Sequence, residues 1–202
     1  MRSFIFLLAM MVTTPVVVMG LLCIFWLPAQ TRRRFVMPWV RMVMGLIRHV
    51  LRIDHCVLGA EHIPKEPCVI FCKHQSAWET FALQTLFPQT AFVYKKELHW
   101  IPFFGWGLAL MPFVAIDRSA GRVALAQVAT RGQQRLKEGY SVIIFPEGTR
   151  MAPGQRGRYK VGGAHLAVTA QVPVIPVALN SGECWPKNAF FKRPGRVTVS
   201  IG

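Results

Sequence analysis

CVIFCKHQSAWETFALQTLF, residues 68–87, joins a short apolar run to a longer amphipathic one through a polar turn. The first five residues have the length and composition of a buried strand, whereas TFALQTLF is typical of a helix. Between them, KHQSAWE at residues 73–79 places several polar side chains where the strand would end. A strand that leads through a polar turn into a helix is a building unit of α/β proteins. This stretch therefore predicts an α/β fold with a functional site at a strand end.

The rest of the chain after residue 53 repeats this alternation. Helices are expected at 77–87, 119–138 and 162–170, with Ser119 as a candidate N-cap and Gly139 just after the C-terminus of the longest. We predict a domain over residues 54–202 with a central, largely parallel sheet flanked by helices. The chain ends on a predicted strand with no closing helix, as a domain truncated at its C-terminus would. The predicted strands are 69–71, 91–94, 113–116, 141–145, 174–179 and 197–201.

The N-terminal region predicts membrane association. Residues 3–31 contain no charged side chain, and about 20 apolar residues suffice to cross a bilayer. A signal peptide is disfavoured because the apolar run is too long and no small-x-small cleavage pattern closes it. Pro15 could kink this helix or turn it back as a re-entrant hairpin. The basic cluster Arg32–Arg34 should stay on the cytoplasmic side, which predicts that the chain beyond residue 34 faces the cytoplasm. We expect the membrane to be a bacterial-type inner membrane.

Residues 35–53 form a second predicted helix with a narrow basic stripe. Arg41, Arg48 and Arg52 would fall within about 40° of one another around the axis, and apolar residues cover much of the rest. One interpretation is a helix that lies in the membrane interface, and the other is a core helix with one solvated edge. We favour the interfacial helix, because the preceding apolar segment brings it to the bilayer. Residues 1–53 are therefore predicted to be membrane and interfacial helices.

The composition narrows the classes of partner. Lys plus Arg is 24 and Asp plus Glu is 9, which gives a net charge of +15, while 52% of the residues are hydrophobic. A charge of this sign favours an anionic membrane surface, an anionic substrate or nucleic acid. Nucleic-acid binding is disfavoured, because the basic residues are not interleaved with an aromatic binding motif and the N-terminus is strongly apolar. The five cysteines lack zinc spacing and are interpreted as reduced thiols, and we expect no metal or resident cofactor.

His74 and Glu79 form the first candidate catalytic pair. Five positions apart in one regular helix they would point about 140° away from each other. They can meet if His74 lies in the loop after the strand and Glu79 lies in the first turn of the helix. The carboxylate could then fix the imidazole tautomer and leave the other ring nitrogen as a base. A lone histidine is more often structural, so this pair alone leaves both interpretations open.

Three further segments follow predicted strands. FPEGTR at 145–150 offers a tight turn followed by a hydroxyl and a guanidinium, which suit a phosphate, although an ordinary turn with a solvated arginine has the same sequence. Arg118 follows the strand 113–116 and could reach the same crevice or form a surface pair with Asp117. Pro173 and Pro176 surround the strand 174–179 and suggest an edge strand or a bulge. Ligands of open α/β sheets bind at such strand ends.

In this order the segments resemble the lysophosphatidate acyltransferases, the HX4D type of glycerolipid acyltransferase, over about residues 69–177. The matching segments are His74–Ser76, Phe113–Arg118, FPEGTR and Val172–Pro176, with KKEL at 95–98 before Pro102 and Gly105, and YKVGGAHLA at 159–167. Each motif is weak alone, and the ordered set is specific.

The resemblance implies a membrane-bound enzyme that moves a fatty acyl group from acyl-CoA or acyl carrier protein to the sn-2 hydroxyl of lysophosphatidate. His74 would be the general base and Glu79 would orient it. The remaining site residues would bind substrate: Lys95, Arg118 and Arg150 would hold the phosphate, and Glu147, Gly148 and Thr149 would shape its pocket.

One residue departs from the family pattern. The usual acid is aspartate, and position 79 is glutamate, a combination that also resembles the lipid A late acyltransferases. FPEGTR favours the glycerolipid branch. Two alternatives stay open: an acyltransferase for another lysolipid, and a membrane-tethered module that binds anionic lipid without turnover. Trp100 and Trp106 are interpreted as core or membrane contacts.

Overall fold

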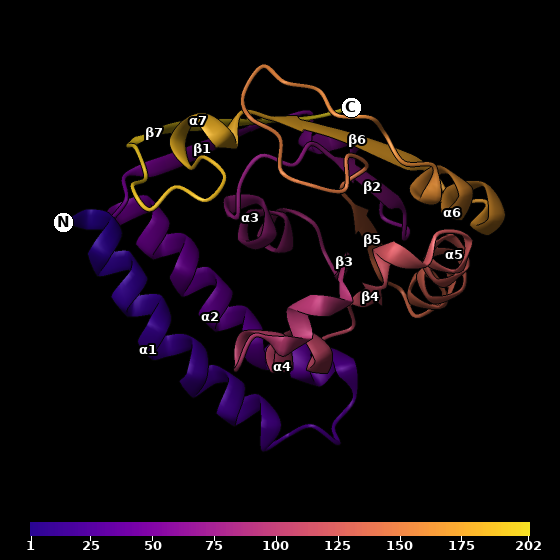
Figure 1. Cartoon of the computed structure of the whole chain (residues 1–202), viewed down its shortest axis with the longest axis horizontal. Helices are drawn as coiled ribbons and strands as arrows, with labels where there is room; N and C mark the ends of the chain where they lie inside the picture. The colour runs from indigo at the N-terminus through magenta and orange to yellow at the C-terminus, as the bar shows by residue number, and fades with distance from the viewer.

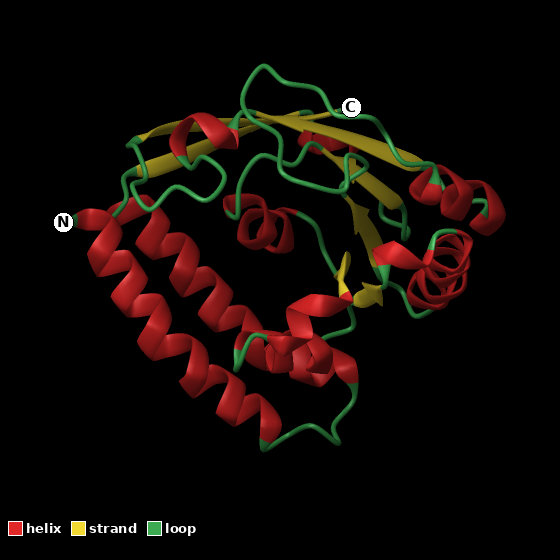
Figure 2. Ribbon diagram, in the orientation of Figure 1, coloured by secondary structure: helices red, strands yellow, loops and turns green.

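The computed structural model describes residues 1–202, except the side chains of Arg118 and Arg122. In this part of the chain, seven strands form one sheet in the order β1-β7-β6-β2-β5-β3-β4 (Figures 1 and 2). The β3–β4, β3–β5, β2–β5, β2–β6 and β1–β7 pairs are parallel, and β6–β7 is antiparallel. The prediction of a largely parallel sheet is therefore confirmed. The strands are β1 (Ile53–Leu58), β2 (Val69–Cys72), β3 (Thr90–Lys95), β4 (Val114–Ile116), β5 (Ser141–Ile144), β6 (Val174–Leu179) and β7 (Gly195–Ile201).

Helices cover both faces of the sheet (Figure 1). On one face lies α3 (Trp78–Leu86), backed by α2 (Ala29–His49), and on the other lie α5 (Arg122–Lys137) and α6 (Gly162–Ala170). The central strands alternate accordingly: Ile70 packs in the core on the α3 side, whereas Val69 packs in the core on the α5–α6 side. Both faces of β2 and β5 are buried, as expected for the near-continuous apolar runs of parallel strands.

Three details of the predicted elements are wrong or incomplete. β1 was missed, because its sequence IDHCVL carries polar residues within a strand that is only partly buried. α5 begins at Arg122 and not at Ser119, because a 3₁₀ turn, η3 (Arg118–Ala120), precedes it and Gly121 is the N-cap. The short helices α4 (Phe104–Leu110) and α7 (Ser181–Cys184) were also missed, since neither is long enough for a helical period to be visible.

Pro176 marks neither of the two predicted features, an edge strand or a bulge, because β6 pairs with β2 residue by residue over Val174–Val177. β6 lies inside the sheet between β7 and β2. The proline is tolerated because β7 pairs only with Val177–Leu179, so the missing N–H of Pro176 lies just outside that ladder. Its carbonyl accepts a hydrogen bond from Gly202 N at 3.0 Å.

The apolar N-terminal run forms a helical hairpin and not a single helix over 3–31. α1 (Arg2–Leu22) continues through Pro15, the chain turns over residues 23–28, and α2 returns beside α1 (Figure 1). The Trp39 indole N–H donates to Thr13 Oγ1 at 3.1 Å between the two helices. The reversal therefore comes after Leu22 and not at Pro15.

α2 is largely a core helix, which corrects its predicted membrane-facing surface. Val43 and Ile47 are fully buried in the core shared with the sheet. Arg41 and Arg48 are exposed on the opposite side, as their spacing predicts, but Arg52 lies beyond the end of the helix with φ of 57°. The apolar surface that suggested a bilayer is covered mainly by protein.

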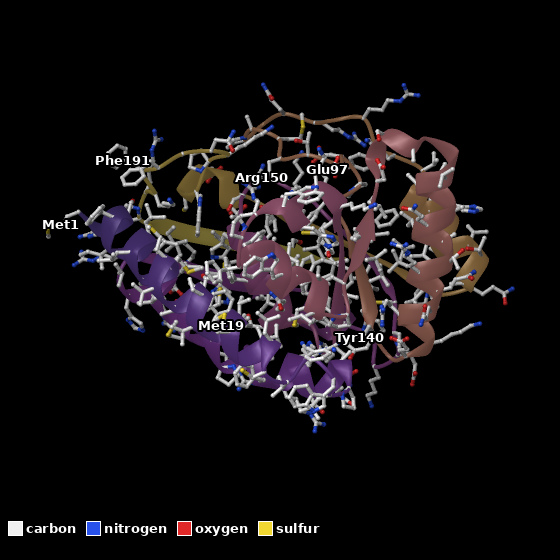
Figure 3. All side chains as sticks on the ribbon, turned by 60° about the horizontal axis from the view of Figure 1, so that its bottom comes forward. Met1, Met19, Glu97, Tyr140, Arg150 and Phe191 are labelled. Atoms are coloured by element: carbon white, nitrogen blue, oxygen red, sulfur yellow. The ribbon has the colours of Figure 1, made fainter. Side chains whose placement is uncertain are left out.

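The start of α1 is fixed to the C-terminal part of the chain. The Phe6 ring meets the Trp185 ring edge to face, with centroids 5.4 Å apart, and Ser3 Oγ accepts from Lys192 N at 3.0 Å. Figure 3 shows Phe191 close to Met1 at this end of the molecule. The hairpin is thus packed on the C-terminal part of the sheet domain, although Phe6 and Trp185 are more than 170 positions apart in the sequence.

Candidate active site

The polar segments gather along one edge of the sheet. β2, β5, β3 and β4 are consecutive parallel neighbours, so their carboxyl ends lie on the same side. Past these ends come, in spatial order, the His74 loop, the FPEGTR turn, Lys95 and the Asp117–Arg118 turn. Ligands of open α/β sheets bind at such carboxyl ends. The topology thus brings together segments that are up to about 75 residues apart in the chain.

His74 and Glu79 are in direct contact. His74 lies in the loop after β2 and Glu79 lies in the first turn of α3, as predicted, and Nδ1 is 2.5 Å from Glu79 Oε2. The Glu79 side chain is fully buried, whereas 14% of the His74 side chain is exposed. The Nδ1–H therefore donates to the carboxylate and leaves Nε2 with its lone pair for a substrate. Glu79, which stands where the family usually has aspartate, thus reaches the His74 imidazole from the first turn of α3.

The other oxygen of Glu79 is bound by its own loop. Oε1 accepts from Gln75 N at 2.9 Å and Ser76 N at 2.8 Å, and also from the hydroxyl of Ser181 on α7. The Ser76 hydroxyl in turn accepts from Trp78 N at 2.8 Å. Glu79 thus reaches back to Ser76 N as in a capping box, but the Ser76 hydroxyl binds Trp78 N and not Glu79 N, and Ala77 is the N-cap of α3. One carboxylate therefore fixes the loop before α3 and orients the imidazole.

A ring from the neighbouring strand fixes the plane of the imidazole. Phe145 follows β5 directly, and its ring stacks on His74 with centroids 3.8 Å apart and planes within 17°. Because β2 and β5 are paired in register, these two side chains leave the sheet side by side. The imidazole is held on one side by a carboxylate and on its face by an aromatic ring.

The FPEGTR turn presents only part of its polar groups to a ligand. Gly148 takes a positive φ of 69°, which a glycine tolerates best, and a Cβ there would come within 3.1 Å of the Lys160 side chain. Thr149 is exposed, and Lys187 Nζ donates to its hydroxyl at 3.3 Å. Glu147 is buried and accepts from Lys73 Nζ at 2.6 Å, so this residue supports the turn from within. Its part in shaping a phosphate pocket stays a prediction.

Comparisons with known proteins identify the family of this chain. The family model described as Acyltransferase matches residues 54–180. The chain is 50% identical to a 1-acyl-sn-glycerol-3-phosphate acyltransferase of Pseudomonas aeruginosa over 177 residues, which are 87% of this chain and 69% of the relative. The chain belongs to the acyltransferase family. The resemblance inferred from the motifs is confirmed.

Two further relatives extend the comparison. A 1-acyl-sn-glycerol-3-phosphate acyltransferase of Cocos nucifera is 32% identical over 197 residues, 95% of this chain and 62% of the relative. The crystal structure of the 1-acyl-sn-glycerophosphate acyltransferase PlsC of Thermotoga maritima has a TM-score of 0.77 and 24% identity, and it covers all of this chain and 83% of that one. The likeness to that crystal structure shows the fold. The chain spans between 54% and 69% of the length of four curated relatives, including the two named above.

In this acyltransferase the three predicted phosphate-binding cations lie at different distances from His74. Lys95 ends β3, two strands from β2, or about 10 Å at the usual spacing of strands. It is exposed, and its Nζ lies 3.8 Å from Glu97 Oε1. Arg150 is partly exposed after the turn that follows the neighbouring β5. The side chain of Arg118 lies outside the described residues, and its backbone follows β4, one strand further away. Lys95 and Arg150 thus belong to the ends of two neighbouring strands, β3 and β5, at this edge of the sheet.

Some contributors to the site were missed by the sequence reasoning. Ser181 binds Glu79, and the Gln75 side-chain carbonyl accepts from Gly182 N at 3.1 Å. The signal available for Ser181 was its place directly after β6, a parallel neighbour of β2. Phe145 was visible only as the first letter of FPEGTR. KHQSAWE places Lys73 beside His74, and no sequence signal joins it to Glu147.

A cavity of about 270 Å³ opens on the other side of Phe145. Its wall is apolar apart from Lys160, and it lies between the carboxyl ends of β3–β5 and the helices α5 and α6. Such a lining suits a ligand with an apolar part and an anionic group. Its lining residues include Val93, Ile116, Val128, Ile144, Phe145 and Lys160.

Proposed function

We propose that this chain transfers a fatty acyl group from acyl-CoA or acyl carrier protein to the sn-2 hydroxyl of lysophosphatidate and so forms phosphatidate. The observation that carries the proposal is the His74–Glu79 pair beside the FPEGTR turn at one sheet edge. The names of the related proteins support the acceptor, because those relatives are described as 1-acyl-sn-glycerol-3-phosphate acyltransferases.

The chemistry needs a single base. His74 Nε2 takes the proton of the acceptor hydroxyl as its oxygen attacks the thioester carbonyl. The imidazolium that forms is stabilised by Glu79 through Nδ1. When the tetrahedral intermediate collapses, the C–S bond breaks and His74 returns the proton to the thiolate. One oxygen–acyl bond forms and one C–S bond breaks, so the reaction balances without a covalent acyl-enzyme.

Arg150, Lys95 and Arg118 supply positive charge for the acceptor phosphate. A phosphate carries more charge than one cation neutralises, so several cations at one edge suit it. Gly148 and Thr149 belong to the turn that carries Arg150 and position it. This assignment leaves Glu147 as an internal support of the turn.

Membrane association through α1 places the enzyme where its acceptor is found. Among the described residues, α1 is the helix long and apolar enough to cross a membrane, and it lies near the N-terminus. Its neighbour α2 carries Arg32–Arg34, which favour an anionic surface and the cytoplasmic side of a bacterial inner membrane. A lysolipid could then be taken directly from the leaflet.

An acyl-transfer assay tests the function. Purified full chain in detergent is given lysophosphatidate or another lysolipid with either thioester donor, and released thiol and phosphatidate are measured. In a folded His74→Ala variant, we expect turnover to fall by about 10²–10⁴-fold, the usual contribution of a general base. Wild-type protein that releases no thiol with lysophosphatidate and either donor would contradict the proposed reaction, and undiminished turnover by His74→Ala would contradict the mechanism.

A further inference from the structure

Lys73, which directly precedes His74, is turned into the protein. Its Nζ donates to Glu147 Oε1 at 2.6 Å and to the Gln155 carbonyl at 2.7 Å. Only 18% of the Lys73 side chain is exposed, and none of the Glu147 side chain is. Exposed ion pairs add little, whereas removing one member of a buried pair leaves a desolvated charge without compensation. Removing Lys73 would therefore leave the buried Glu147 carboxylate without a compensating charge and disturb the residues around it.

The pair connects the two loops on which the proposed reaction depends. Lys73 follows β2 and Glu147 follows β5, and a second link runs from Met151 N to the His74 carbonyl at 2.8 Å. Burial alone would raise the pKa of the Glu147 carboxyl, but hydrogen bonds from Lys73 Nζ and Gly157 N–H outweigh it and hold that pKa below its usual value. The backbone N–H of His74 acts in the same direction. The carboxylate is thus ionised and lies next to the histidine backbone.

We propose that Lys73 is a positioning residue for the general base: through its buried ion pair with Glu147 it fixes the His74 loop against the FPEGTR turn. The imidazole and Arg150 then keep one separation, as an acceptor held by its phosphate requires. This inference rests on the proposed acyl transfer for its kinetic consequence. The ion pair itself has a consequence that can be measured without turnover.

The charged groups around His74 define that consequence. Glu79 faces it from α3, Lys73 and Glu147 form the pair beside it, and Arg150 follows along the turn. The Cys72 thiol of β2 stays neutral, because burial, with the Glu79 charge, raises its pKa well above the usual value. Removing Lys73 leaves an excess of negative charge and stabilises the imidazolium. Removing the charge of Glu147 leaves an excess of positive charge and destabilises it.

The test compares Lys73→Met, Lys73→Arg, Glu147→Gln and the double variant Lys73→Met/Glu147→Gln in the full chain. Arg135→Met on α5 is the matched control, because it breaks an ion pair with Glu138 away from the site. We expect Lys73→Met to lower kcat by roughly tenfold to a hundredfold, with KM for lysophosphatidate changed less, and Lys73→Arg to recover most of the loss. The control should keep wild-type kcat.

The second readout is the pH at which His74 titrates, followed by NMR of the imidazole and by the acid limb of kcat/KM. It should move to higher pH in Lys73→Met and to lower pH in Glu147→Gln. The double variant should lie near wild type. A loss of fold alone would move the His74 titration in the same direction in both single variants.

Folded variants with wild-type kcat and an unmoved His74 titration would overturn the proposal. Should Lys73→Met fail to fold, Glu147→Gln and the double variant still give the predicted order of titration. If the wild-type chain transfers no acyl group, the proposed function fails, while the NMR titration still decides whether the pair acts on His74.

Discussion

Glu79 is the residue on which the site converges. Its two oxygens contact the His74 imidazole, two backbone N–H groups of its own loop and the Ser181 hydroxyl. Aspartate is one methylene shorter and would have to keep all these donors after a shift of the helix start. The four contacts therefore make the glutamate hard to replace by aspartate, and the sequence predicted only one of these partners, His74.

Ser181→Ala tests the contribution of the most distant of these donors. The substitution removes a hydrogen bond to a buried carboxylate, for which about 1.5–3 kcal/mol is usual. We expect lower thermal stability and a moderate fall in kcat, since Glu79 would hold His74 less firmly. Unfolding and turnover are measured for this variant and for Thr169→Ala, whose hydroxyl binds only carbonyls of its own helix α6. Equal effects of the two substitutions would show that Ser181 has no special part.

Arg150→Lys tests the phosphate assignment with the charge preserved. The guanidinium can bind two phosphate oxygens at once, whereas an ammonium is a point charge. We expect kcat/KM for lysophosphatidate to fall by about tenfold to a hundredfold, the equivalent of a lost charge-assisted hydrogen bond. A neutral acceptor such as a monoacylglycerol should lose much less, if it is used. Losses of the same size on both acceptors would refute the assignment.

At the scale of elements, α1 serves as a structural helix as well as an apolar surface. Phe6 is 4% exposed and packs on Trp185, whereas Phe4, on the same helix, is 59% exposed. α1 also supplies Val18 and Leu21 to buried positions beside α2 and α4. Deleting this helix would therefore uncover core residues, so that such a deletion tests more than membrane binding.

Phe6→Ala and Phe4→Ala separate the two roles of α1. Truncating a buried phenylalanine usually destabilises a protein by about 3–5 kcal/mol, whereas truncating an exposed one has a small effect. We expect Phe6→Ala to lower the melting temperature clearly in detergent, and Phe4→Ala to leave it nearly unchanged while weakening vesicle binding. Equal melting temperatures would mean that α1 does not pack on the domain in solution.

At the scale of the whole molecule, α1 and α4 lie side by side (Figure 1), and both helices carry exposed apolar side chains. α1 exposes residues that recur every three or four positions. The η2–α4 segment, made of the 3₁₀ turn η2 (Lys96–Trp100) and α4, exposes Trp100 at 86% and Trp106 at 45%. α2 lies beside α1 and exposes Arg41 and Arg48, which could not follow α1 through a bilayer without desolvation. This arrangement favours a helix that lies in one membrane interface. The exposed residues on α1 are Phe4, Ile5, Leu7, Leu8, Met11, Val12, Val16 and Met19.

Trp100→Gln tests whether the η2–α4 segment belongs to this membrane-facing surface. Tryptophan favours the membrane interface, and loss of a ring that is inserted there should weaken binding by about tenfold. Vesicle sedimentation of the full chain measures it, with Val168→Ser as the control, because Val168 is 76% exposed on the distant helix α6. Turnover with detergent-dispersed acceptor should stay close to wild type. A Trp100→Gln variant that binds vesicles as wild type does would remove this segment from the membrane surface.

Much of the fold followed from local patterns in the sequence. The apolar runs VIF, SVII and VIPVAL are strands, and the helix 162–170 has the predicted bounds, because these signals depend on residues close together in the chain. The contact of His74 with Glu79 was equally predictable, since a loop residue and a first-turn residue five positions apart can meet only in one way. The family followed from the order of its motifs.

The remaining features depend on which segments become neighbours, and only the tertiary structure decides that. The apolar residues of α2 have the pattern of a membrane-surface helix and of a core helix alike, and the sheet beneath them makes them core. Pro176 predicted an edge, but the short pairing of β7 with β6 lets a proline lie inside the sheet. Lys73 and Glu147 are 74 positions apart, and the parallel pairing of β2 with β5 makes them an ion pair. Local sequence fixes the elements, whereas the pairing of distant strands selects the partners of each side chain.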